Sequence, residues 1–243
     1  MKLLLRWLVL CAVAALALQI YFVGRIATMA VLAPESTTFE RSEIWRIANE
    51  KGAVPWRQEW ADYANISVNL KRAVIASEDD GFSQHDGVDW EAIEKAWAKN
   101  AKAEQKAEQR ASQGKAPAKP PKIVGGSTIT QQLAKNLFLS GERTLLRKGQ
   151  ELVLTMLLEQ LLSKQRILEL YLNHVEFGEG VFGAEAAAQH YYRKPASKLT
   201  AYEAARLAVM LPRPKYFEKV PNSGYLASRA GTIVARMPDA QLP

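Results

Sequence analysis

The sequence predicts a mainly α-helical protein that begins with one membrane-spanning helix. Two observations support this fold class. Residues 3–23 form a nearly unbroken apolar run, and from residue 125 onward apolar residues recur with the spacing of amphipathic helices. No segment shows the alternation of apolar and polar residues that is typical of a half-buried strand. A sheet-based architecture is therefore not expected.

The composition is that of a folded chain. The 243 residues are 48% apolar and 23% charged, which is close to the average of globular proteins and argues against disorder. The net charge of +7 is concentrated in residues 1–33 and 95–122. Since no basic face spreads over the fold, a nucleic-acid partner is not expected. Cys11 is the single cysteine, which excludes an internal disulfide and a cysteine-based metal cluster.

Residues 1–33 are interpreted as a membrane anchor. A bilayer core needs about 20 helical residues, and Arg6 and Gln19 are the polar interruptions of the apolar run. Lys2 and Arg6 lie at its start, and Arg25 follows it. The two charges at the start, together with the charged amino terminus, outnumber Arg25 and favour a cytoplasmic N-terminus. A cleaved signal peptide, with an Ala-Leu-Ala cleavage site, is the alternative. We favour a retained anchor because the apolar run continues beyond that site.

Two regions follow the anchor. Residues 34–68 form a juxtamembrane segment that reads as a linker with short helices, although its three tryptophans could also contact the membrane interface. Residues 69–243 are predicted to form the main domain, with helices on either side of a loop at 81–87. Within it, residues 99–122 are a low-complexity insert rich in Ala, Lys and Gln that we expect to be mobile and solvated.

Local signals predict where several helices begin and end. Thr128 and Thr200 each open a capping box, in which a Thr side chain and a Gln or Glu three residues later bond to each other's backbone. The second helix is expected to close at Pro212. A long periodic segment over 145–172 should break near Ser163, and residues 223–237 should form a terminal amphipathic helix.

The first cluster of chemically active residues spans 76–89. It contains five carboxylates, among them Glu78 and Asp79, together with His85 and two glycines. A solvated acidic loop is the simple interpretation. However, an apolar helix leads into the cluster, which places Glu78 at a helix end that faces a turn. A partly sheltered carboxylate there would have a raised pKa and could act as a general base.

The second cluster is residues 125–136, where two glycines precede a run of hydroxyl and amide side chains. Glycines let the backbone approach a ligand closely, and the start of the following helix offers free N–H groups to an anion. Thr128, Gln131 or Gln132, and Lys135 fall on one helical face. An ordinary capped helix with a polar outer face is the alternative interpretation, but the density of polar groups favours a binding site.

The third cluster is Arg147, Lys148 and Glu151. Arg147 and Glu151 are four residues apart, so a surface ion pair that contributes a few tenths of a kcal/mol is the simple interpretation. The order is unfavourable for that role, because the cation precedes the anion. Together with Lys135, the two cations could instead form a pocket for a diphosphate, with Glu151 inside it.

Two other motif matches are rejected. Residues 178–183 match G-x-G-x-x-G, but the segment before them has helical spacing, whereas a dinucleotide site needs a strand there. We therefore expect a tight loop between helices. Residues 112–115 match the S-x-x-K of transpeptidases, but they lie in the low-complexity insert and no K-T-G follows. His85, His174 and His190 lack metal-ligand spacing.

These clusters, in this order, resemble the peptidoglycan glycosyltransferases of family 51, in particular their monofunctional biosynthetic form. The resemblance covers residues 69–219. The motifs that carry it are Glu78-Asp79-x-x-Phe82-x-x-His85-x-Gly87, residues 125–136, Arg147-Lys148-x-x-Glu151, Lys164-x-x-Ile167-Leu168-Glu169-x-Tyr171-Leu172-Asn173, Phe177-Gly178-x-Gly180-Val181-Phe182-Gly183 and Leu211-Pro212-x-Pro214. The long insert at 99–122 and the Asp80-Gly81 pair depart from the family pattern.

The resemblance implies a lysozyme-like, mainly helical glycosyltransferase domain with a small membrane-embedded lobe. It implies polymerisation of lipid II, the disaccharide-pentapeptide carried on undecaprenyl diphosphate. The 4-hydroxyl of lipid II attacks the anomeric carbon of the growing chain, the lipid diphosphate leaves, and the new β-1,4 bond has inverted configuration. A single-pass protein of the bacterial inner membrane is expected, with its N-terminus inside and its catalytic domain in the periplasm.

The resemblance also implies the site residues. Glu78 would be the base, and Glu151 the second essential carboxylate, in the donor site. The expected substrate-binding residues are Gly126, Ser127, Thr128, Gln131, Gln132, Lys135, Asn136, Arg147 and Lys148, and those that support the motif are Asp79, Phe82, His85 and Gly87. Glu151 could hold the two cations in place or bind a divalent cation, Mg or Mn, at the diphosphate; the sequence leaves both open.

The expected partners are lipid II, the growing glycan chain, the membrane and proteins of cell-wall synthesis or division, with no nucleic acid. Two other functions remain as alternatives. A membrane-bound lysozyme-like enzyme that cleaves peptidoglycan would need a catalytic Glu but no cation cluster. A scaffold without activity would use the basic insert to bind anionic lipid or polymer.

Overall fold

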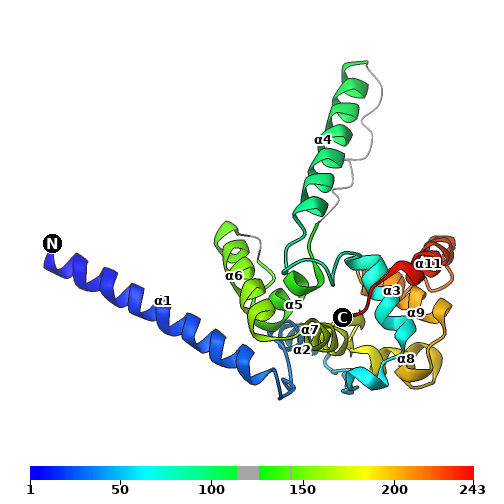
Figure 1. Cartoon of the computed structure of the whole chain (residues 1–243), viewed down its shortest axis with the longest axis horizontal. Helices are drawn as coiled ribbons and strands as arrows, with labels where there is room; N and C mark the ends of the chain where they lie inside the picture. Colours follow the sequence, from blue (N-terminus) through cyan, green and yellow to red (C-terminus); the bar gives the residue numbers. More distant parts are fainter. Residues whose placement is uncertain (114–125, 143) are drawn as a thin grey trace.

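The chain folds into a helical body from which two long helices project in different directions, as Figure 1 shows. The computed structural model describes residues 1–113, 126–142 and 144–243. The helices are α1 Lys2–Thr28, α2 Thr38–Lys51, α3 Val68–Glu78, α4 Trp90–Ser112, α5 Ile129–Phe138, α6 Leu145–Leu161, α7 Lys164–His174, α8 Ala184–Tyr192, α9 Ala201–Met210, α10 Pro214–Phe217 and α11 Gly224–Arg236. The strands are β1 Arg57–Gln58, β2 Glu176–Gly178 and β3 Val181–Phe182, and single 3-10 turns lie at Tyr63–Asn65, Ala196–Lys198 and Met237–Asp239. The predicted mainly α fold is confirmed.

Helix α1 has the length and composition of a membrane span and also takes part in the body. It has 27 residues, and an 18-residue stretch of it has a mean hydropathy of 2.2. Near its end, Phe22 and Ile26 are buried, and the Phe22 ring packs edge-on against Phe138 of α5 with 5.3 Å between ring centroids. Arg166 of α7 donates from Nε to the Met29 carbonyl just beyond α1, at 2.7 Å. Helix α1 also packs against α6. Its C-terminal half is therefore fixed to the body through α5, α6 and α7 rather than joined to it by a flexible linker.

The segment 34–68 is built into the body. Helix α2 opens with a capping box between Thr37 and Glu40, and it packs against α5. The Glu40 carboxylate is fully buried, and its Oε1 lies 2.8 Å from Nδ1 of the buried His174 on α7. These contacts join residues that are far apart in the chain. Local composition does not reveal such contacts, so the segment resembled a linker in the sequence. The domain boundary at residue 69 stays a prediction.

A small sheet is the element that the sequence did not predict. Strands β2 and β3 form an antiparallel hairpin at the expected inter-helix loop, and β1 pairs parallel with β3. Each strand has only two or three residues, too few to show an alternating pattern. In the hairpin turn, Gly180 has φ +75°, and a Cβ there would lie 1.8 Å from the Pro55 carbonyl oxygen. Glycine is required at this position because both the backbone conformation and the close approach exclude a side chain.

The predicted helix boundaries are confirmed. Thr128 and Thr200 form capping boxes with Gln131 and Glu203, at the starts of α5 and α9. Ser163 caps α7 and separates it from α6. The terminal amphipathic helix is α11, one residue shorter at each end than predicted. These signals succeed because each one acts between residues three or four apart.

The core joins two groups of helices. Helix α3 packs against α9 and α11, and α5 packs against α2, α6 and α7. Helices α3 and α5 bury nearly all their apolar residues, including Leu70, Ile75, Ile129 and Leu133, each with no exposed surface. The ends of α3 and α5 carry the first two predicted clusters, so this packing fixes the candidate site.

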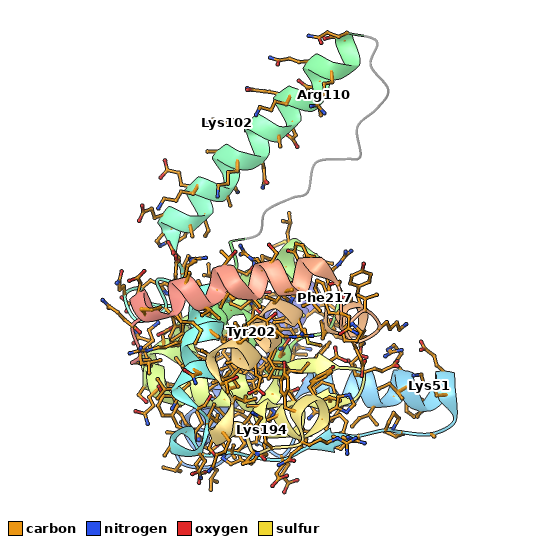
Figure 2. The ribbon with its side chains drawn as sticks, turned by 90° about the vertical axis from the view of Figure 1, so that its right-hand side faces the viewer. Lys51, Lys102, Arg110, Lys194, Tyr202 and Phe217 are labelled. Carbon is orange, nitrogen blue, oxygen red and sulfur yellow. The ribbon has the colours of Figure 1, made fainter. Side chains whose placement is uncertain are left out.

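Helix α4 projects from the body, and Lys102 and Arg110 lie along it in Figure 2. The expected helix after the 81–87 loop is confirmed, and it continues through Ser112 into the segment predicted to be a mobile insert. The remaining insert residues, 114–122, lie outside the described residues, so the mobility of the insert stays a prediction.

Glu176 in β2 is a buried acid that should make the stability of the folded state depend on pH. Burial raises its pKa from 4.5 to about 7, although Lys215 lies 3.5 Å away and acts in the opposite direction. A group whose pKa is higher in the folded state stabilises that state fully at pH values below the unfolded pKa. This stabilisation is lost as the pH rises from 4.5 through about 7.

We therefore expect Glu176→Gln to be more stable than wild type at pH 8.5, by an upper limit of roughly 3 kcal/mol. The difference should largely vanish at pH 5, where Glu176 is protonated in the folded protein. Thermal unfolding of detergent-solubilised protein at both pH values measures it, with the exposed Glu35→Gln as control. An equal shift at both pH values would contradict the prediction.

Candidate active site

Glu78 is the last residue of α3, where the helix leaves the core. The preceding residues Val74, Ile75 and Ala76 are buried and fix the helix end. The Glu78 side chain is half-buried, and its Oε2 accepts a hydrogen bond of 3.1 Å from Nε2 of Gln132 on α5. Burial raises the pKa of Glu78, while the hydrogen bond from Gln132 lowers it. The predicted rise of the pKa is confirmed in direction, which suits this carboxylate to accept a proton.

Tyr171 of α7 sets the orientation of Gln132. Its buried hydroxyl donates to Oε1 of Gln132 at 3.0 Å, so the amide must direct its NH₂ group toward Glu78. Helices α3, α5 and α7 thus meet in a chain of two hydrogen bonds that ends on Glu78. Tyr171 lies in the motif at residues 164–173 and was not among the predicted site residues.

Asp79 and His85 lock the loop after α3 onto the start of α5. Asp79 Oδ2 accepts from the Ile129 backbone N–H at 2.9 Å, and Asp79 Oδ1 lies 2.8 Å from His85 Nε2. The Gly87 N–H donates to His85 Nδ1 at 3.1 Å, which assigns the neutral tautomer with its proton on Nε2. Asp79, His85 and Gly87 are therefore brought together as a support for the loop, and Phe82 is fully buried beside His85.

The start of α5 uses several of its polar groups internally. Thr128 Oγ1 accepts from the Gln131 N–H and donates to the Gly87 carbonyl at 2.6 Å. Since Asp79 holds the Ile129 N–H, two of the helix-start N–H groups that the sequence suggested for an anion already have acceptors. Gln131 and Asn136 are buried, Gly126 is half-buried, and Ser127 and Lys135 are exposed. An anion at this helix would therefore depend mainly on the nearby cations.

The cations surround Glu151 on α6. Glu151 is 3% exposed, and its two oxygens face different partners: Arg147 Nη1 lies 3.1 Å from Oε2, and the Lys148 ammonium contacts Oε1. The Lys148 side chain remains half-exposed. Glu151 thus draws two cations to one point. The site can offer positive charge to a diphosphate, with the acid as an internal counter-ion.

Helix α5 connects the helices that carry the two predicted acids, Glu78 and Glu151. It contacts Glu78 through Gln132 on one side and packs against α6, which carries Glu151, on the other. The same region of the chain matches a known protein family. The Transglycosylase family model matches residues 47–238, which covers most of the body and both acids. The chain belongs to the transglycosylase family.

Curated relatives match nearly the whole chain. A biosynthetic peptidoglycan transglycosylase of Burkholderia thailandensis is 53% identical over 98% of this chain and 88% of the relative. Proteins with the same name from Paraburkholderia phytofirmans and Herminiimonas arsenicoxydans are 49% and 47% identical, over 98% and 99% of this chain and 94% and 97% of theirs. The suspected relationship to the biosynthetic glycosyltransferases is confirmed.

The described residues of this transglycosylase do not fit a divalent cation held by Glu151. Both Glu151 oxygens contact cations, which a metal ion would have to displace. Over residues 1–113, 126–142 and 144–243, no group of three or more His, Cys, Asp and Glu side chains is arranged to hold a metal. Of the two explanations for Glu151, this geometry favours the one in which Glu151 holds Arg147 and Lys148 in place.

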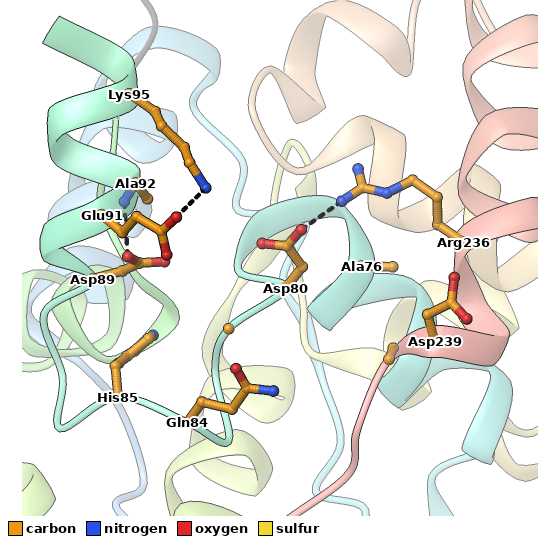
Figure 3. A pocket seen from close by; sticks show the side chains of 12 residues that line it. Ala76, Asp80, Gln84, His85, Asp89, Glu91, Ala92, Lys95, Arg236 and Asp239 are labelled. Carbon is orange, nitrogen blue, oxygen red and sulfur yellow. Dashed lines mark hydrogen bonds and ion pairs between the residues drawn. The ribbon is translucent and has the colours of Figure 1, made fainter.

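A cavity of about 640 Å³ opens beside the end of α3. It lies between the loop after α3, the first two turns of α4 and the C-terminal segment, as Figure 3 shows. Among the predicted site residues, only His85 lines it. Asp80 and Arg236 pair across one wall at 2.8 Å, and Lys95 pairs with Glu91 on another at 2.6 Å. Sequence reasoning missed Arg236 and Arg229 of α11, the latter close enough to lower the pKa of Glu78, because neither lies in a recognisable motif.

Proposed function

We propose that this transglycosylase polymerises the glycan strands of peptidoglycan. It transfers the growing lipid-linked chain onto the 4-hydroxyl of lipid II with inversion, forms β-1,4 links and releases undecaprenyl diphosphate. The observation that carries the proposal is a half-buried acid with a raised pKa, oriented by Gln132, joined through α5 to two cations that converge on one point. Relatives named biosynthetic peptidoglycan transglycosylase support it.

The proposed reaction assigns a task to each group. Glu78 in its ionised form takes the proton of the acceptor 4-hydroxyl as that oxygen bonds to the anomeric carbon. The bond from the anomeric carbon to the diphosphate breaks on the opposite face, and its electron pair leaves with the diphosphate. Arg147 and Lys148, with Lys135, stabilise the negative charge that develops there. Gln132 holds Glu78 through its hydrogen bond, and Thr128 supports the start of α5.

The cleaving alternative is less well supported. An enzyme that hydrolyses an uncharged glycosidic link has no use for cations converging on one point, whereas a departing diphosphate does. The names of the relatives describe biosynthesis rather than degradation. The observed cluster around Glu151 therefore favours synthesis.

We propose the bacterial inner membrane as the location, with α1 as a single span, the N-terminus inside and the catalytic domain in the periplasm. Helix α1 is long and apolar enough for this role, and Lys2 and Arg6 at its start favour the orientation. The anchor would confine the enzyme to the surface where its lipid substrate diffuses. We further propose proteins of cell-wall synthesis or division as partners, which would meet the enzyme at that surface.

The direct test is polymerisation by the purified full chain. In detergent, we expect labelled lipid II to be converted into long glycan strands, resolved by gel electrophoresis and digestible by a muramidase. The strands should carry the lipid diphosphate at one end, with free undecaprenyl diphosphate as the second product. Consumption of preformed strands without synthesis would instead support the cleaving enzyme.

A further inference from the structure

Gln19 is a polar residue within the apolar stretch of helix α1, and its hydrogen-bond partner lies on another helix. Its Nε2 donates to Oε1 of Gln150 on α6 at 3.1 Å, and Gln150 Nε2 donates back to Gln19 Oε1 at 3.3 Å. Its neighbours Leu18 and Ile20 are 48% and 63% exposed, whereas Gln19 is half-buried. The amide therefore points at α6, while adjacent side chains point away from the body.

In the membrane location proposed for α1, this amide pair would hold the two helices together, whereas in water the solvent would compete for the same hydrogen bonds. In hydrocarbon an amide finds no water, so polar side chains of membrane helices bond to other helices and join them. A reciprocal amide pair satisfies both groups at once and fixes the rotation of each helix. The pair can form in one rotational setting of α1 only, the setting in which Gln19 faces α6.

The position of Gln150 connects this contact to the candidate site. Gln150 directly precedes Glu151, and Arg147 and Lys148 lie within one turn of it. The first turn of α6 has little packing of its own, since Leu145 and Leu146 are 94% and 87% exposed. Contact with α1 is therefore an important constraint on the helix segment that presents the cations.

We propose that Gln19 is a positioning residue of this enzyme. Through Gln150 it holds the first half of α6, and with it Arg147 and Lys148, in the geometry that receives the lipid diphosphate. The anchor is then a structural part of the donor site. This inference rests on the proposed function, because its consequence for activity concerns the same substrate.

The kinetic test compares variants that keep α1 insertable. Gln19→Leu and Gln150→Leu should each lower kcat/KM for lipid II about fivefold, equivalent to about 1 kcal/mol, mainly through a higher KM. The double variant should be no worse than either single one, since both remove the same contact. Ile20→Ala, next to Gln19 but exposed, should match wild type. Losses that multiply in the double variant, or a Gln19→Leu enzyme equal to wild type, would overturn the proposal.

Two further variants exclude a general effect of anchor polarity. Exchanging the two residues, Gln19→Ile with Ile20→Gln, preserves composition but turns the amide away from α6, and should reproduce the loss. In a Cys11→Ser background, Gln19→Cys with Gln150→Cys should be joined by a short thiol-specific bifunctional reagent far faster than Ile20→Cys with Gln150→Cys. Equal cross-linking of the two pairs would contradict the contact. This readout needs no activity, so it separates failure of this inference from failure of the proposed function.

Discussion

Replacing Glu78 by glutamine should lower the rate of glycan polymerisation about 10²- to 10⁴-fold, the range expected for loss of a general base. Glutamine has nearly the same shape and can still accept the hydrogen bond from Gln132, so the fold should survive. The measurement is the initial rate with lipid II, together with the unfolding temperature. Glu94→Gln on the exposed face of α4 serves as the matched control and should retain wild-type turnover.

The pH profile provides a second check on Glu78. Burial raises its pKa above the ordinary 4.5, and the base must be ionised to accept a proton. Activity should therefore be lost as the pH falls through a value higher than that of an exposed glutamate. A Glu78→Gln enzyme with undiminished polymer formation would remove the base assignment, whatever its pH profile.

Replacing Glu151 by glutamine should have the next largest effect, a loss of roughly 10²-fold in kcat/KM. The neutral amide no longer draws Arg147 and Lys148 to one point, and a displacement of about 1 Å near the reacting groups can cost this much. Because Glu151 is buried, some stability should also be lost, so activity is compared at a temperature where the variant is folded. The exposed Glu142→Gln is the control.

A double variant separates the two roles considered for Glu151. If it acts by holding the cations, Glu151→Gln combined with Arg147→Ala should be little worse than the more damaged single variant, since both changes break one unit. A strong dependence of wild-type activity on added Mg²⁺, abolished selectively in Glu151→Gln, would instead favour a cation-binding carboxylate. The ion pairs to both Glu151 oxygens lead us to expect the first result.

Elements specified by neighbours in the chain could be predicted from sequence. Thr128, Ser163 and Thr200 act on backbone groups three residues away, so their motifs indicate helix starts without knowledge of the fold. The long apolar run indicates α1 by length alone. The ion pairs of Glu151 with Arg147 and Lys148 also follow from spacing, because the three residues lie within two turns of one helix, whereas their role in a reaction stays a prediction.

Features that depend on distant residues could not be predicted in this way. The short strands exist because β1 reaches β3 across more than a hundred residues, and neither has a pattern of its own. The bond between Glu40 and His174, which turns an apparent linker into part of the body, joins α2 to α7. The same holds for Tyr171, whose effect on Glu78 passes through Gln132 of a third helix. Packing, rather than spacing, determines each of these contacts.

The seating of α1 has a consequence for how a polymer can grow. With α1 in the membrane as proposed, the burial of Phe22 and Ile26 in the core and the bond from Arg166 to the Met29 carbonyl hold the catalytic body at a fixed distance from the bilayer. In that arrangement the body could not move away from the lipid surface together with a lengthening product. Under the proposed function, each round of addition would then move the finished part of the strand away from a catalytic body that stays at the membrane.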